Sequence, residues 1–242
     1  MIRYRENIDN LVFTEDTQNL LLTKHIAVIG CGGQGGYTLE YLARLGVKEI
    51  SFWDGDIYEE SNLNRQIGCL TSTLNQYKAI VLKNRIQDIN PKIKVNCYNW
   101  FFGDKTTDIE YLLKADFIFT AADCHYNLLQ FRELLKIAIK HDIPVIDYPV
   151  NVLGGWVRIE TKRDLSHFDF MTSMLIKQYQ REQKSKDRVS QPAFKCAIIA
   201  GEAVNQMVQY FANQRYAYID ANLNIDLYHH KYIEEDRFGI IP

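Results

Sequence analysis

The feature that most constrains this chain is a run of glycines between a short apolar segment and an amphipathic one. The run, GCGGQGG, spans residues 30–36 and follows the β-prone residues 25–29. Residues 32–45 carry apolar side chains at helical spacing and end at Gly46, and residues 49–53 are again β-prone. Glycines at a strand-to-helix turn let the backbone bend sharply and approach a phosphate, with helix N–H groups facing the anion. The pattern predicts a βαβ unit whose turn can bind phosphate.

The alternation of strand and helix signals continues beyond this unit. Further β-prone segments are residues 93–98, 116–121, 143–147, 156–161 and 216–233. Segments with helical spacing are residues 74–89, 108–114, 126–140 and 194–211. Strands and helices that alternate in this way predict an α/β fold with a Rossmann-like, doubly wound, mainly parallel sheet.

We expect these elements to form a single domain with three parts. Residues 1–24 are predicted to form an N-terminal arm with a short helix, and residues 25–150 the Rossmann-like nucleotide-binding core. Residues 151–242, with closing strands and a helix, are expected to complete the same domain. Within them, residues 162–191 are polar and charged, which indicates a solvated loop or exposed helix, or a flap over a site.

Composition excludes several classes of protein. The chain has 242 residues, 47% of them apolar and 24% charged, which argues against disorder. Its formal net charge of −2 argues against a protein that coats nucleic acid. Five scattered cysteines without a Cys-x-x-Cys pair argue against a disulfide framework and a thiolate zinc site. The polar N-terminus and the lack of a long apolar run indicate a cytoplasmic protein without a membrane segment.

An acid follows the glycine run at the distance that a nucleotide requires. Asp54 ends the second predicted strand, eighteen residues after Gly36, where an acid can accept hydrogen bonds from ribose hydroxyls. Such an acid is compatible with a dinucleotide, such as NAD or FAD, and with a nucleoside triphosphate. The following stretch favours the triphosphate, because Asn62, Arg65 and Lys78 supply several groups that bind phosphate oxygens or neutralise their charge.

Several stretches of residues 1–160 match the motifs of one known family. They are GCGGQGG, LARLGVKEISFWDGD, ESNLNRQ, INP at 89–91 and TAADCHYNLLQFR at 120–132. In these motifs the sequence resembles the ThiF/MoeB/HesA family, the bacterial relatives of ubiquitin-activating enzymes. The resemblance implies an adenylyltransferase, which joins a carboxylate to the AMP part of ATP and releases pyrophosphate.

The resemblance also implies a role for individual residues. Asp54 would hold the ATP ribose, and Gln66 would support the phosphate-binding loop. Asp123 would bind Mg²⁺ near the α-phosphate, and Arg65 and Lys78 would be catalytic with it. The residues expected to bind ATP are Gly30, Gly32, Gly33, Gly35, Asp54, Asp56, Asn62, Arg65, Gln66, Lys78 and Arg5.

Assembly and metal content follow partly from the resemblance and partly from departures from it. Members are commonly homodimers, so Arg5, or Arg3, is expected to reach the ATP of a partner subunit, although the spacing differs by one residue. No zinc is expected, because the paired cysteines of many members are lacking. Cys124 stands where many members have Asn. Cys196, at the start of the last long helix, is predicted to be a buried core residue rather than a sulfur carrier.

The identity of the activated carboxylate stays open. The first hypothesis is the Gly-Gly tail of a small ubiquitin-like sulfur-carrier protein. The alternatives are a ribosomal precursor peptide, activated for natural-product synthesis, and a carboxylate on a tRNA nucleoside, which the balanced charge disfavours. Two rivals come from other classes. The retained Asp54, Arg65, Lys78 and Asp123 argue against a catalytically inactive scaffold. Lys78 and the Asn-Leu-Asn-Arg-Gln segment at 62–66 argue against an NAD-dependent enzyme.

Overall fold

A computed structural model gives the architecture of most of the chain. The residues that it describes are 2–9, 13–122, 128–151, 153–161, 165, 169, 172–173, 176, 191–212, 217 and 221–235. Most of the predicted segment 162–191 therefore lies outside the described residues.

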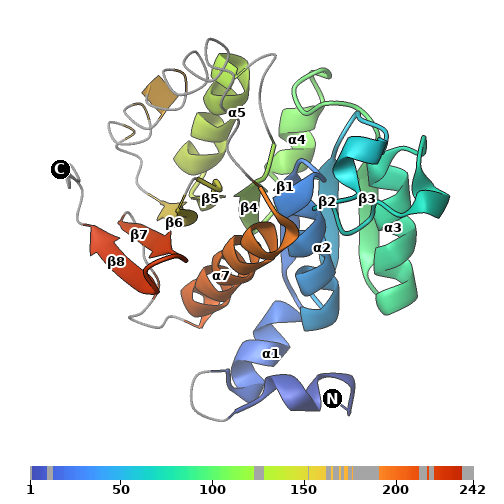
Figure 1. The fold of residues 1–242 in the computed structure, drawn as a ribbon. Helices are drawn as coiled ribbons and strands as arrows, with labels where there is room; N and C mark the ends of the chain where they lie inside the picture. Colours follow the sequence, from blue (N-terminus) through green and yellow to red (C-terminus); the bar gives the residue numbers. More distant parts are fainter. Residues whose placement is uncertain are drawn as a thin grey trace.

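Eight strands of the described residues form one mixed sheet (Figure 1). The strands are β1 (His25–Ile29), β2 (Glu49–Trp53), β3 (Lys94–Tyr98), β4 (Phe117–Thr120), β5 (Val145–Asp147), β6 (Gly154–Glu160), β7 (Asn222–Asp226) and β8 (Lys231–Glu235). Their order across the sheet is β3-β2-β1-β4-β5-β6-β7-β8. The first five of these are parallel, and β6, β7 and β8 continue the sheet in antiparallel pairs.

Helices cover both faces of the parallel part of the sheet. The α-helices of the described residues are α1 (Glu15–Leu21), α2 (Gly33–Leu45), α3 (Lys78–Ile89), α4 (Asp108–Leu112), α5 (Leu128–Lys140) and α7 (Ala193–Phe211). Three short 3₁₀ helices, η1 (Ile2–Asn7), η2 (Glu60–Asn62) and η3 (Thr71–Thr73), accompany them. Helices α2, α3 and α7 pack on one face, and α4 and α5 on the other (Figure 1).

Strand β1 shows why its sequence is apolar throughout. Ile26 and Val28 point into the core under α2 and α7, whereas Ala27 and Ile29 point into the core under α5. All four side chains are buried, because successive residues of a strand face opposite sides and both sides are covered.

The strand order reverses between β1 and β4, and this reversal positions the site. In open α/β sheets, ligands bind beyond the carboxyl ends of the strands at such a point. Gly30 ends β1 there with a φ of +96°, and a Cβ on it would lie 2.7 Å from backbone atoms of Ala121 and Ala122. A glycine is thus required for the turn after β1 to pack against the end of β4.

In the described residues the predicted elements are confirmed in type and order, and several of their bounds differ. The helix expected over residues 74–89 begins only at Lys78, because Asn75 has a φ of 65° and its N–H donates to the Tyr58 carbonyl. Strand β6 begins at Gly154 instead of residue 156. The closing strands β7 and β8 extend the same sheet. None of the helices in the described ranges has the length and apolarity needed to cross a bilayer.

Candidate active site

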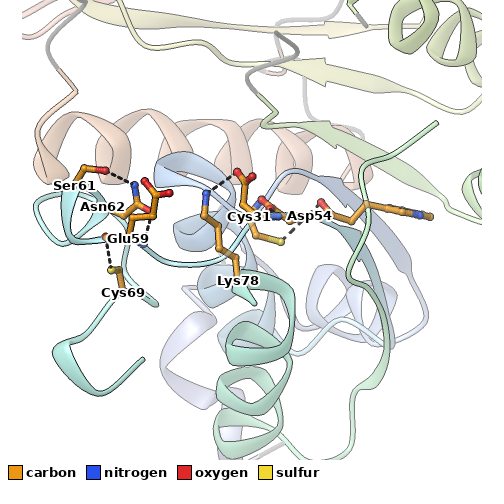
Figure 2. Close-up of polar contacts among 9 residues, drawn as sticks. Cys31, Asp54, Glu59, Ser61, Asn62, Cys69 and Lys78 are labelled. Atoms are coloured by element: carbon orange, nitrogen blue, oxygen red, sulfur yellow. Dashed lines mark hydrogen bonds and ion pairs between the residues drawn. The ribbon is translucent and has the colours of Figure 1, made fainter. Parts of the chain in front are cut away.

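Three segments meet at the carboxyl ends of β1 and β2. They are the glycine turn before α2, the loop that follows Asp54, and the first residue of α3, Lys78. Figure 2 shows Cys31, Asp54 and Lys78 together at this edge, with Asn62 nearby. They come together because the carboxyl ends of neighbouring parallel strands lie at one edge of a sheet.

Asp54 is held rigidly at the end of β2. Its Oδ2 accepts a hydrogen bond of 2.7 Å from the Cys31 N–H, and its Oδ1 accepts one of 2.9 Å from the Asp56 N–H. The residue is only 7% exposed. Burial raises the pKa of Asp54, and the positive charge of Lys78 and the two N–H donors offset this effect only in part. The carboxylate is therefore fixed in direction and poorly solvated.

Lys78 brings a positive charge to the same edge. Its Nζ lies 2.9 Å from Asp56 Oδ2, and its side chain is 8% exposed, whereas that of Asp56 is 53% exposed. The first turn of α3 contains no acidic residue. A cation at the N-terminus of a helix is disfavoured by the helix dipole, so this end of α3 favours a further anion.

The glycines of the turn differ in what they contact. A Cβ on Gly35 would lie 2.0 Å from the Gly30 carbonyl oxygen, so packing alone requires glycine there. Among the described residues, in contrast, a Cβ on Gly32 would meet only Gln66 Nε2, at 3.8 Å. Gly32 is the N-cap of α2 and provides no side-chain cap. Packing thus leaves open the backbone at the start of α2, where helix N–H groups lack intrahelical partners.

The loop after β2 brings Arg65 to the glycine turn. A Cβ on Gly33 would lie 3.7 Å from Arg65 Cγ. The guanidinium donates from Nη1 to the Ser61 carbonyl at 2.8 Å and to Asn64 Oδ1 at 2.9 Å. No carboxylate of the described residues forms an ion pair with Arg65, so its positive charge is not neutralised by a salt bridge there.

Asn62 and Gln66 are buried in the same loop. Asn62 Oδ1 accepts a 3.1 Å hydrogen bond from the Glu59 N–H, and Asn62 Nδ2 donates to Ser61 Oγ at 3.2 Å (Figure 2). Gln66 is 7% exposed, yet its Oε1 has no hydrogen-bond partner in the part of the chain that the structure describes. Buried polar atoms are rarely left unpaired, so Gln66 indicates a place where a bound group can complete the site.

Not all the predicted residues are found at this edge. Asp123 and Cys124 lie outside the described residues. Arg5 lies near the opposite end of α2, because its neighbour Tyr4 packs against Gly46 and accepts a 2.8 Å hydrogen bond from Asn90 Nδ2. Helix α2 is roughly 20 Å long, at 1.5 Å per residue. The role predicted for Arg5 therefore depends on a partner subunit.

Arg3 and Cys196 also take structural positions. Arg3 Nη1 donates to the Ile89 carbonyl at 2.6 Å. Cys196 is fully buried, as predicted, and its Sγ would lie 3.0 Å from a Cβ on Gly33. In the described ranges, no group of three His, Cys, Asp or Glu side chains is arranged to hold a metal ion.

The structure adds Phe101, which the sequence analysis did not identify. This side chain follows β3, is 49% exposed, and would lie 3.0 Å from a Cβ on Gly55, the residue after Asp54. Its only signal in the sequence was an apolar residue just beyond a predicted strand.

Known proteins resemble this chain in sequence. A family model described as the ThiF family matches residues 4–237. The tRNA threonylcarbamoyladenosine dehydratase of Bacillus subtilis (strain 168) is 33% identical over 138 residues, which are 57% of this chain and 53% of that protein. The sulfur carrier protein ThiS adenylyltransferase of Escherichia coli (strain K12) is 29% identical over 147 residues, 60% of this chain and 57% of that protein. The chain thus spans about half the length of the curated relatives it matches.

Solved structures share the fold at lower identity. A crystal structure of PaaA superimposes with a TM-score of 0.79 at 24% identity and covers 98% of this chain and 82% of that chain. A crystal structure of E. coli MccB with ATP superimposes with a TM-score of 0.73 at 18% identity, covering 91% of this chain and 66% of that chain.

Proposed function

The chain belongs to the ThiF family, and we propose that it is an adenylyltransferase that uses ATP to activate a carboxylate. The arrangement that carries this proposal is the meeting of three features at one sheet edge. They are a buried carboxylate, Asp54, a buried cation, Lys78, and the open N-terminus of α2 beside Arg65.

ATP fits the donors and acceptors at this edge. Asp54 accepts from the ribose hydroxyls, while Lys78, Arg65 and Asn62 bind phosphate oxygens beside the backbone N–H groups of the glycine turn. Phosphate oxygens approach α2 where Gly32 leaves space. Gln66, whose Oε1 is unpaired among the described residues, supports this loop and is completed by the bound nucleotide.

The proposed reaction needs charge neutralisation more than proton transfer. A carboxylate oxygen forms a bond to the α-phosphorus while the bond from that phosphorus to the bridging oxygen breaks, and pyrophosphate leaves with the electron pair. The carboxylate is ionised at neutral pH, so no general base is needed. Lys78 and Arg65 stabilise negative charge on the phosphates in the transition state. Asp123 is proposed to hold Mg²⁺, which supplies further positive charge when bound.

The first choice of acceptor is the Gly-Gly tail of a small sulfur-carrier protein. A relative named as a ThiS adenylyltransferase supports this choice. A tRNA nucleoside carboxylate is the second candidate, because another relative is named as a tRNA threonylcarbamoyladenosine dehydratase. A ribosomal precursor peptide is the third, supported only by the shared fold of PaaA and MccB.

We further propose a cytoplasmic homodimer. Large apolar side chains are exposed on the segments around the start of α3: Ile57, Leu63, Leu70, Tyr77 and Ile80. Contiguous exposed apolar patches mark protein interfaces, and we propose that these side chains form the contact surface of the dimer. We propose that the second copy supplies Arg5 to the site in trans.

The test is exchange of labelled pyrophosphate into ATP, measured separately with a Gly-Gly-tailed carrier protein, a precursor peptide and a tRNA that bears a nucleoside carboxylate. We expect exchange that depends on one of these carboxylates and on Mg²⁺. Exchange with the carrier supports the first choice, and exchange with only one of the others replaces it. ATP binding without exchange for any of the three would reject adenylation of these acceptors.

A further inference from the structure

The loop after β3 places an aromatic ring beside the proposed nucleotide site. The Asp54 N–H donates a 3.0 Å hydrogen bond to the carbonyl of Tyr98, the last residue of β3. Three residues later, Phe101 lies against Gly55, with ring atoms 3.0 Å from where a Cβ would be. The ring is therefore next to the backbone of the residue that follows the ribose-binding acid.

Hydrogen bonds anchor this loop, while the side chain of Phe101 stays partly exposed. The buried carboxylate of Asp108 accepts hydrogen bonds from Trp100 Nε1 at 3.0 Å and from the Gly103 N–H at 2.9 Å. These contacts fix the Trp100 side chain on one side of Phe101 and the Gly103 backbone on the other. The ring itself remains 49% exposed.

The packing of the described residues does not explain the exposure of Phe101. Neighbouring rings form a packed group, in which Trp53 stacks on Tyr98 and contacts Phe102 edge-on. Within the described ranges Phe101 makes no such ring contact. An exposed aromatic ring on an anchored loop is thus available to a flat ligand group.

The order of groups along the sheet edge matches the order of groups in a nucleotide. The strands β1, β2 and β3 are neighbours, about 5 Å apart. The glycine turn follows β1, Asp54 follows β2, and Phe101 follows β3. With phosphates at the turn and the ribose at Asp54, the base extends to the side of β3.

We propose that Phe101 is the platform on which the nucleobase of the substrate stacks, so that the site takes a nucleoside triphosphate and not the triphosphate group alone. This inference rests on the proposed ATP site and adds a specificity-determining residue to it. Stacking on one ring recognises the flat face of a base rather than its edges.

The test compares ligands that differ only in having a base. Binding of ATP and of inorganic tripolyphosphate, each with Mg²⁺, is measured by calorimetry for the wild type, Phe101→Ala and Phe101→Trp. We expect Phe101→Ala to weaken ATP binding roughly 5- to 150-fold, the range reported for loss of one base–aromatic stack. Its tripolyphosphate binding should be unchanged, and Phe101→Trp should bind ATP as the wild type does.

Kinetics and a matched control complete the test. In pyrophosphate exchange, Phe101→Ala should raise KM for ATP and leave kcat and KM for pyrophosphate nearly unchanged, because stacking contributes equally to ground and transition states. Tyr232→Ala, which removes another exposed ring, on β8, should change none of these values.

Two results would overturn the proposal while leaving the ATP site intact. One is ATP binding by Phe101→Ala at wild-type strength. The other is an equal loss of ATP and tripolyphosphate binding, which would mean that the ring only supports the loop of Asp54. A wild-type protein that binds no ATP would instead reject the proposed function itself.

Discussion

Lys78 Nζ lies 2.9 Å from Asp56 Oδ2, in an ion pair whose cation is buried and whose anion is largely exposed. The asymmetry matters, because the exposed carboxylate can turn away toward water while the ammonium stays at the site edge. A phosphate group that binds at this edge can then replace Asp56 as the ion-pair partner of Lys78. Asp56, predicted to bind ATP, is in this structure the group that neutralises Lys78.

The contribution of the Lys78 charge to catalysis can be tested by comparing a Lys78 variant with a variant of its ion-pair partner, Asp56. Lys78→Ala should lower pyrophosphate exchange by about 10²–10³, the usual loss for one preorganised electrostatic contact, because the charge acts on the forming transition state. Asp56→Asn breaks the same ion pair without removing the cation, so it should change exchange far less. Circular dichroism should show both variants folded. Equal losses in the two variants would mean that Lys78 acts only through its ion pair.

Alanine variants of two glycines in the same turn should distinguish an effect on stability from an effect on ATP binding. Gly35→Ala places a Cβ 2.0 Å from the Gly30 carbonyl oxygen, so we expect a loss of stability of about 1–3 kcal/mol or more. Gly32→Ala has space and should unfold at nearly the wild-type temperature, yet bind ATP more weakly, because its methyl group occupies the phosphate approach. Thermal unfolding and ATP titration of both variants check this. Undiminished ATP binding by Gly32→Ala would place the phosphates elsewhere.

The raised pKa of Asp54 predicts a particular pH dependence of stability. Its pKa is raised chiefly by burial, so the folded protein binds this proton more tightly than the unfolded chain. The contribution of Asp54 to the free energy of unfolding is then lowest at neutral pH and rises as the pH falls through the raised pKa. Relative to Asp54→Asn, the wild type should gain stability between pH 7 and pH 4 in urea titrations.

Glu40 is the control, because its pKa is shifted in the opposite direction to that of Asp54. Burial raises its pKa, but hydrogen bonds from Arg85 and Arg44 more than offset this effect, and the pKa of Glu40 is lowered overall. Relative to Glu40→Gln, the wild type should lose stability over the same fall in pH, as the carboxylate approaches protonation. If a fall in pH changed the free energy of unfolding in the same direction for both acids, the environments assigned to Asp54 and Glu40 would be wrong.

The cysteines should prove dispensable for ATP chemistry. Cys196→Ala and Cys124→Ala should retain pyrophosphate exchange, because forming an acyl-adenylate needs no thiol. Cys196 is fully buried and should also resist alkylation in the folded protein. If Cys196→Ala keeps exchange but abolishes sulfur transfer to a carrier, the interpretation of this residue as structural fails.

The sequence predicts the fold and much of the site because these depend on local patterns. Alternating apolar segments and the glycine turn place β1, α2 and β2, and the position of Asp54 at a strand end places it at the ligand-binding edge. The start of α3 was predicted too early, because the pairing of Asn75 with Tyr58 is a tertiary contact. Phe101 was missed because a single exposed aromatic residue in a loop has no periodicity. The burial of Gln66 likewise becomes visible only when α2 and the loop after β2 are brought together.

Calorimetric titration with ATP and with NAD, in the presence of Mg²⁺, tests the central claim most directly. The full-length wild type should bind ATP and not NAD, and Lys78→Ala and Arg65→Ala should each weaken ATP binding without loss of the fold. Tight binding of NAD with no binding of ATP would contradict the account, because the same glycine turn and Asp54 would then serve a dinucleotide.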